Sequence, residues 1–155
     1  MKDLKDFLNE SLVNESKIPP IGASSIVEFL KGEEDWSVLS GDFGWDQKYV
    51  DLLKDHAKFI EADGGYNGDG DGWIIDTTED EEFDKESLGY GRVNLRTPSI
   101  KKLLDNKKVK DLLGIKDVKA AGIYWISGYN SPTLIAFDID NADVKKILDN
   151  IEEEL

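Results

Sequence analysis

The side chains of this chain best suited to chemistry are the oxygen-bearing groups of a glycine-rich segment, residues 63–80. Within it, Asn67, Asp69 and Asp71 stand at every second position, and glycines separate them. This alternation lets a tight loop turn successive side chains toward one centre. A hard cation such as calcium takes about six to eight oxygen ligands, which closely spaced carboxylates supply. The spacing therefore predicts a candidate calcium site.

Residues 67–78 of this segment resemble an EF-hand calcium loop. Asn67, Asp69 and Asp71 match its first, third and fifth positions, and Gly72 matches its sharp-turn glycine. The resemblance implies a ligand set made of Asn67, Asp69, Asp71, the carbonyl of Trp73 and, from just outside the usual pattern, Asp76.

The segment also departs from the EF-hand pattern. Thr78 stands at the twelfth position, where an EF-hand has a bidentate glutamate, and Glu79 comes one residue late. The alternative interpretation is a solvated glycine-rich turn whose acids serve solubility. A phosphate-binding loop is not expected, because no lysine accompanies these glycines and Asp69 and Asp71 would repel an anion.

The formal net charge of the chain is −14, and its acids are concentrated in one part of the sequence. Residues 61–86 hold eleven acids and one lysine, a net of −10, which leaves −4 for the rest. Because like charge repels phosphate and anionic lipid, neither direct nucleic-acid binding nor membrane binding is expected. A basic protein partner is expected instead. The residues predicted to meet it are Glu79, Asp80, Glu81, Glu82, Asp84 and Glu86, with a solvated acidic loop as the alternative.

An enzymatic function is left open, and no catalytic residue is assigned. His56 is the only histidine, and its place in an apolar helical stripe predicts a packed, structural side chain. A two-carboxylate hydrolase is a further alternative, which requires a pair of acids about 5–9.5 Å apart and flanked by tryptophan. Trp36 and Trp45 are predicted to be exposed, and Trp125 is predicted to be buried in a strand.

The length predicts one domain over residues 1–155, with a hydrophobic core large enough to be stable without disulfides or a structural metal. The chain has no cysteine, which excludes disulfides and thiolate chemistry and fits a reducing compartment. No signal peptide and no run of 18 uncharged apolar residues is recognisable, so we expect a cytoplasmic protein without a membrane span.

Hydrophobic periodicity and turn residues predict a set of helices and strands that are largely segregated along the chain. The expected helices are residues 4–13, 25–31, 46–60, 98–104, 109–113 and 144–155. The expected strands are residues 73–76, 91–95, 122–127 and 133–139, the last two joined as a hairpin. This order predicts an α+β fold with a small antiparallel sheet packed against several helices.

Residues 1–16 resemble the leader of capsid-targeted internal proteins of T-even-like tailed phages. They match the pattern Met-Lys-x-x-x-x-Phe-Leu-x-Glu, and Leu8, Asn9 and Glu10 match a Leu-x-Glu processing signal. The resemblance implies a phage origin, a peripheral leader helix and a location in the virion. An ordinary first helix is the alternative.

Overall fold

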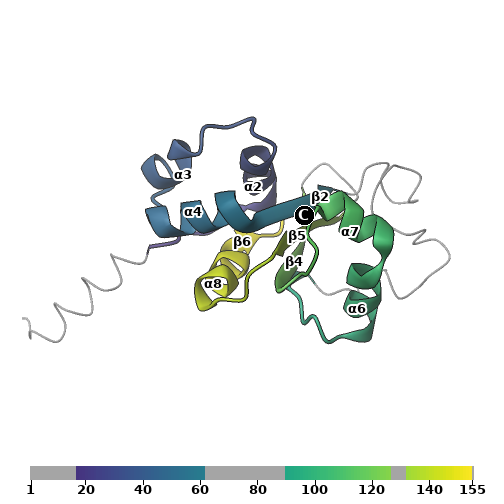
Figure 1. Cartoon of the computed structure of the whole chain (residues 1–155). Coiled ribbons are helices and arrows are strands. Elements are labelled where there is room, and N and C mark those ends of the chain that lie inside the picture. The colour runs from purple at the N-terminus through teal and green to yellow at the C-terminus, as the bar shows by residue number, and fades with distance from the viewer. Residues whose placement is uncertain (1–16, 62–89, 127–131, 155) are drawn as a thin grey trace, which may run out of the picture.

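The computed structural model describes residues 17–61, 90–126 and 132–154, and its fold is α+β, as the sequence predicts (Figure 1). The described helices are α2 (Ala23–Leu30), α3 (Ser37–Gly41), α4 (Gln47–His56), α6 (Pro98–Asp105), α7 (Lys107–Leu113) and α8 (Ala142–Asn150). The described strands are β1 (Ile21–Gly22), β2 (Ala57–Glu61), β3 (Gly91–Arg92), β4 (Ala120–Trp125), β5 (Pro132–Phe137) and β6 (Ile151–Glu152). None of the helices in these three ranges has the length and apolar character needed to cross a membrane.

Four of the strands form one antiparallel sheet in the order β2-β5-β4-β3. The predicted late hairpin is confirmed, since β4 pairs with β5 from Ala120↔Phe137 to Trp125↔Pro132. The other two strands, β1 and β6, form a short parallel pair with Ile21 opposite Ile151. The sequence analysis did not predict this pair, because two-residue strands carry no periodicity that a pattern can show.

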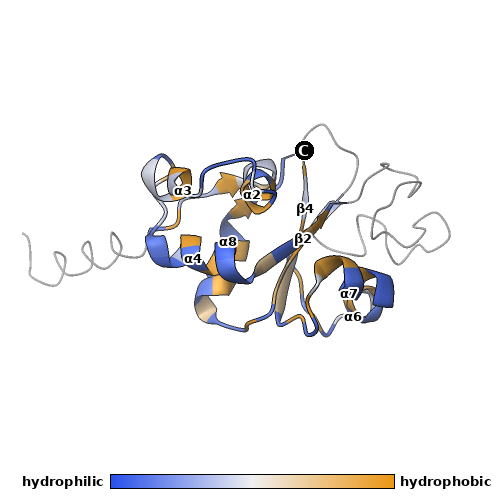
Figure 2. Cartoon of the chain, turned by 45° about the horizontal axis from the view of Figure 1, so that its top comes forward, coloured by the Kyte–Doolittle hydropathy of each residue, from blue (hydrophilic) through white to orange (hydrophobic). Residues whose placement is uncertain are grey.

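The sheet is covered on both faces. Every residue of β4 and β5 is buried, and their side chains alternate between two hydrophobic clusters. Helices α2, α3, α4 and α8 lie on one side of the sheet, and α6 and α7 lie on the other (Figure 2). A strand that is buried on both faces favours apolar residues at nearly every position, and β4 and β5 follow this rule apart from the buried polar side chain of Thr133.

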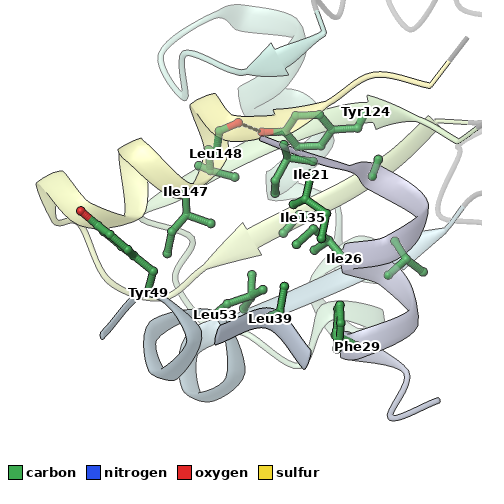
Figure 3. Packing of buried hydrophobic residues seen from close by; sticks show 14 of the residues in the cluster. Ile21, Ile26, Phe29, Leu39, Tyr49, Leu53, Tyr124, Ile135, Ile147 and Leu148 are labelled. Atoms are coloured by element: carbon green, nitrogen blue, oxygen red, sulfur yellow. Dashed lines mark hydrogen bonds between the residues drawn. The ribbon is translucent and has the colours of Figure 1, made fainter. Parts of the chain in front are cut away.

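The larger cluster lies between the sheet and the four helices on that side, and Figure 3 shows its centre. Ile135 of β5 and Tyr124 of β4 face helix residues such as Leu53 and Ile147 there. The Tyr124 hydroxyl donates a hydrogen bond to the carbonyl of Leu148 in the last turn of α8. This bond satisfies a carbonyl that lacks an intrahelical partner, because α8 ends at Asn150.

The smaller cluster lies under α6 and α7. Its helical members are Ile100, Leu103, Leu104, Val109 and Leu113. They pack with side chains from the opposite face of the same strands, namely Ile60, Ala121, Ile123, Leu134 and Ala136. The two clusters therefore share one sheet as their common wall.

Several predicted helix ends are confirmed. Thr97 occupies the N-cap position of α6 with Pro98 as the first helical residue, and Gly114 ends α7 in a left-handed conformation with φ 65°. Gly32, with φ 78°, follows α2 as predicted. The predicted capping hydrogen bond is absent, however, because the Thr97 side chain occupies the N-cap position without accepting a hydrogen bond from the helix backbone.

Two predicted helices are shorter than expected. The helix predicted over residues 46–60 ends at His56, and Ala57–Glu61 instead forms strand β2 along β5. The predicted C-terminal helix likewise ends at Asn150, where Ile151 enters strand β6. In both places, apolar residues spaced three or four apart fit a helix equally well, and pairing with a distant strand decided the conformation.

Candidate functional site

The residues that the sequence analysis singled out for ligand binding all belong to residues 62–89, outside the described residues. They comprise the candidate calcium ligands Asn67, Asp69, Asp71, Trp73 and Asp76, and the candidate partner-binding acids Glu79, Asp80, Glu81, Glu82, Asp84 and Glu86. Residues 1–16, which carry the leader resemblance, also lie outside. Within the three described ranges, no group of three or more His, Cys, Asp or Glu side chains is arranged to hold a metal ion. The calcium site remains a prediction.

The described residues contain a pocket of about 450 Å³ at one end of the sheet. Three separate parts of the chain line it. Residues 92–96 lead from the end of β3 to α6, and residues 119–121 lead into β4. Asp140, which lies between β5 and α8, and Lys145 of α8 complete the lining. Two backbone hydrogen bonds hold the first two parts in place. Val93 N donates to Ala121 O over 3.0 Å, and Lys119 N donates to Phe137 O over 2.8 Å.

The charged side chains of this pocket are mainly basic. Arg92, Arg96, Lys119 and Lys145 line it together with a single acid, Asp140. The lining therefore carries a formal charge of +3 in a chain whose net charge is −14. A concave surface lined by one sign of charge concentrates ions of the opposite sign.

Three of these four cations form ion pairs at the rim of the pocket. Arg92 Nε lies 3.3 Å from Asp149 Oδ1, and Lys145 Nζ lies 3.2 Å from Asp140 Oδ1. Lys119 Nζ lies 2.6 Å from Asp117 Oδ2, and this hydrogen bond lowers the pKa of the Asp117 carboxyl and raises that of the Lys119 ammonium.

The fourth cation, Arg96, belongs to the turn between β3 and α6. Its backbone N–H donates to Asn94 Oδ1 over 3.0 Å, which fixes the turn, while its guanidinium has no acidic partner within 4.0 Å among the described residues. Among the described residues, the pocket thus holds one cation without an acidic partner and three whose acidic partners are exposed. The net positive lining favours an anion over a cation, and it carries no pair of carboxylates for acid–base hydrolysis.

A smaller pocket of about 120 Å³ adjoins the first, since Leu95 lines both. Lys101, Lys110 and Lys116 line it, with the acids Asp105 and Asp117. Neither pocket is lined by a tryptophan, so neither offers the arrangement that a tryptophan-flanked hydrolase requires.

His56 occupies a different position from the one predicted. Its side chain is 35% exposed, and Nδ1 lies 2.9 Å from Asp138 Oδ1, just beyond β5. The helical stripe that was predicted to bury it ends here, because β2 begins at the next residue. His56 therefore links the end of α4 to the end of β5 through a polar contact.

The tryptophan predictions have mixed outcomes. Trp125 is buried, as predicted, and its ring stacks on that of Tyr90 with centroids 5.6 Å apart. The prediction for Trp45 is wrong: its side chain is only 2% exposed, and its indole N–H donates to Pro19 O over 3.0 Å. Trp36 is half-buried against Phe29, with ring centroids 5.7 Å apart. The hydrogen bond to Pro19 explains why Trp45 can be buried, because an indole is well accommodated in a core once its N–H is bonded.

The basic pocket was missed at the level of sequence, although one signal pointed to its charge. Residues 90–126 hold nine Lys or Arg and three Asp, a net of +6. Counting charge by segment outside the acidic stretch would have found this excess. The contribution of Asp140 and Lys145, which come from a distant segment, depends on how α8 packs beside β3.

Comparison of the chain with family models, with curated proteins and with solved structures finds no match.

Proposed function

We propose that this protein is a non-enzymatic protein–protein interaction module that binds a basic protein partner. The observation that carries the proposal is the separation of charge between segments of the chain. All of the positive excess belongs to residues 90–126, while residues 17–61 and 132–154 together carry −9 and residues 62–89 carry −9.

The acidic side chains are available to a partner on the described surface. Exposed acids occur on the turn after α2, where Glu33, Glu34 and Asp35 follow one another, and near the C-terminus, where Glu152 and Glu153 are exposed. Charged patches of this kind steer encounter with an oppositely charged protein and raise the rate of association, which falls as salt screens the field.

The partner-binding acids predicted from the sequence are proposed as the centre of the binding region, namely Glu79, Asp80, Glu81, Glu82, Asp84 and Glu86. The test is capture of partners on the tagged full-length protein, quantified by mass spectrometry, for the wild type and for a variant with Glu79, Asp80, Glu81 and Glu82 changed to their amides. The expected result is loss of basic partners from the variant, since the field that attracts them is removed.

A matched control distinguishes the segment from net charge alone. Changing Glu28, Asp42, Asp51 and Asp55 to their amides removes the same number of charges from exposed positions of the described surface that are not assigned to the partner. Retention of the partners by this control, together with their loss from the first variant, supports the proposal. Unchanged capture by both variants contradicts it, and equal loss from both assigns the effect to net charge.

The second candidate is a calcium-binding module, which the alternation of Asn67, Asp69 and Asp71 favours. Calorimetric titration of the metal-stripped protein with calcium, and then with magnesium, tests it. Saturable binding that is lost on changing Asp69 and Asp71 to alanine supports the site, and absence of heat in the wild type removes it.

A further inference from the structure

We propose that the pocket lined by Arg92, Arg96, Lys119 and Lys145 is a binding site for a small phosphate-bearing ligand. The proposal is independent of the acidic binding region, because none of the acids proposed to bind the partner lines the pocket. It stands on three observations: the convergence of four cations, the weakness of their existing ion pairs, and the size and floor of the pocket.

The four cations are not neighbours on the solvent-facing side of a single amphipathic helix. Lys101, Lys102, Lys107 and Lys108 lie on the solvent side of α6 and α7, where charge is the ordinary complement of a buried apolar face. The pocket cations come instead from the end of β3, the turn that follows it, the residue before β4 and helix α8, which meet only in the folded chain. Such convergence places several donors around one volume.

The existing ion pairs are weak competitors for an incoming phosphate. The side chains of Arg92, Lys119 and Lys145 are between 45% and 47% exposed, and those of their partners Asp149, Asp117 and Asp140 are between 52% and 70% exposed. Solvent-exposed pairs of this kind contribute little to stability. A phosphoryl group carries more charge than a carboxylate and accepts from several donors at once, so it exchanges favourably for them.

Arg96 is the cation best placed to recognise the phosphoryl group. No acid pairs with its guanidinium among the described residues, so it can offer its planar pair of N–H donors to two phosphoryl oxygens without breaking another contact. The turn that carries it is held by the bond from its own N–H to Asn94 Oδ1 and by the bond from Thr97 N to Asn94 O. The backbone at Arg96 is therefore ordered before any ligand binds.

The size and floor of the pocket indicate a small organic phosphate. A volume of about 450 Å³ falls in the range of small-ligand sites, which is roughly 300–1,000 Å³. Ala120 and Ala121 are buried at its floor, and Val93 and Leu95 are half-buried beside them, which suits a short carbon skeleton. The net charge of −14 disfavours a long polyanion such as a nucleic-acid strand more than a small phosphate, which contacts the lining alone.

The experiment is calorimetric titration of the full-length protein at low salt with fructose 1,6-bisphosphate, inorganic pyrophosphate, unphosphorylated fructose and a single-stranded oligonucleotide. Saturable binding of fructose 1,6-bisphosphate without binding of fructose is the expected result. Binding of pyrophosphate with equal strength would assign recognition to the phosphoryl groups alone and still support the site. Binding of the oligonucleotide in preference to both would overturn the proposal, as would absence of binding by every phosphorylated probe.

Three variants locate the binding. Arg96→Gln is expected to weaken it by about tenfold or more, since a charge-assisted hydrogen bond is lost. Asp140→Asn is expected to strengthen it by several-fold, since the single acid of the lining is neutralised and Lys145 is released. Lys54→Gln removes one exposed positive charge of α4, outside the lining, and is expected to change affinity by less than about twofold because salt screens distant charges.

The test remains decisive even if one variant folds poorly, because Asp140→Asn is expected to raise the affinity and unfolding cannot raise it. Equal affinities of the wild type, Arg96→Gln and Asp140→Asn would overturn the assignment of the site. An equal loss in Arg96→Gln and Lys54→Gln would overturn it as well, because binding would then follow net charge.

Discussion

The two sides of the central sheet are covered by layers that differ in size and in charge. Among the described residues, the layer of α2, α3, α4 and α8 encloses a cluster of twenty buried side chains, and the layer of α6 and α7 encloses one of eleven. The segments of the first layer are net negative, whereas residues 90–126, which contain the second, are net positive by six charges.

In this fold, most of the apolar burial lies on one side of the sheet and the net positive charge lies on the other. Among the described residues, the buried aromatic side chains other than Trp125 belong to the larger cluster, for example Trp45, Tyr49 and Phe137, so most of the apolar burial belongs to the acidic side. The smaller layer is built from short helices with many surface lysines. It depends on the shared strands for its packing, because short helices have little stability of their own.

The largest expected effect comes from cavities made in each cluster. Leu53→Ala in the larger cluster and Leu103→Ala in the smaller one each remove a fully buried side chain. Each is expected to lower the free energy of unfolding by about 2–5 kcal/mol. Because the sheet is a wall of both clusters, both variants are expected to shift one common transition in urea, followed by circular dichroism and tryptophan fluorescence.

Separate unfolding of the two layers would contradict the prediction of one common transition. A Leu103→Ala variant whose fluorescence transition stays at the wild-type midpoint, while part of the helical signal is lost earlier, would show that the α6–α7 layer opens independently.

A second prediction concerns Gly122, in the strand shared by both layers. A Cβ atom added there would lie 2.6 Å from Tyr124 Cε2 and 2.7 Å from Cζ, and the Tyr124 hydroxyl is held by Leu148. Gly122→Ala is therefore expected to destabilise the protein by about 1–3 kcal/mol through overpacking. Gly41→Ala is the control, because a Cβ at Gly41 has nothing within 4 Å. Equal melting temperatures of the two variants would contradict the prediction.

A third prediction sharpens the role of Tyr124 in the larger cluster. Tyr124→Phe leaves the buried Leu148 carbonyl without its donor, at an expected cost of about 1–3 kcal/mol. It is measured at pH 7 by urea unfolding. A cost below about 0.5 kcal/mol would mean that water or another donor replaces the hydroxyl.

The same side chain makes stability depend on alkaline pH. Burial raises the pKa of the Tyr124 phenol well above its ordinary value near 10, and Asp149 adds to the shift. The unfolded chain therefore releases this proton at a lower pH than the folded chain, and the contribution to stability is complete below about pH 10 and falls above it. The stability difference between the wild type and Tyr124→Phe is expected to shrink above pH 10, and a constant difference would contradict this.

The smallest expected effects compare one helix cap from each layer. Asn106 Oδ1 accepts from Lys108 N and Val109 N at the start of α7, and Asn141 Oδ1 accepts from Asp143 N and Val144 N at the start of α8. Replacing either asparagine by alanine is expected to cost about 1 kcal/mol. Thermal unfolding measures both, and a much smaller cost for Asn106 would show that the α7 cap is frayed in the native state.

Much of this fold was predictable from local chemistry. The α+β class, the β4–β5 hairpin and the start of α6 at Thr97 and Pro98 follow from signals within a few residues, and the structure confirms them. Gly114 ends α7 for a local reason as well, because a glycine adopts positive φ without a side-chain penalty.

The candidate site was less predictable, because its residues are distant in sequence. Arg96 and Lys145 are separated by 49 positions, yet both line one pocket. Each looks like an ordinary surface cation when considered with its neighbours along the chain. Only the antiparallel pairing of β3 with β4, and the packing of α8 beside them, brings these cations together.

The amino-acid sequence by itself determined the acidity of the protein, the absence of cysteine chemistry, the class of the fold and the apolar strands of its core. These properties depend on composition and on periodicities that short-range sterics and burial impose. The tertiary structure alone decided that Ala57–Glu61 and Ile151–Glu152 are strands, that Trp45 is buried, and that four cations share one pocket. The physical reason is the same in each case: partners from distant parts of the chain supply the hydrogen bonds, the burial and the charge that local sequence leaves open.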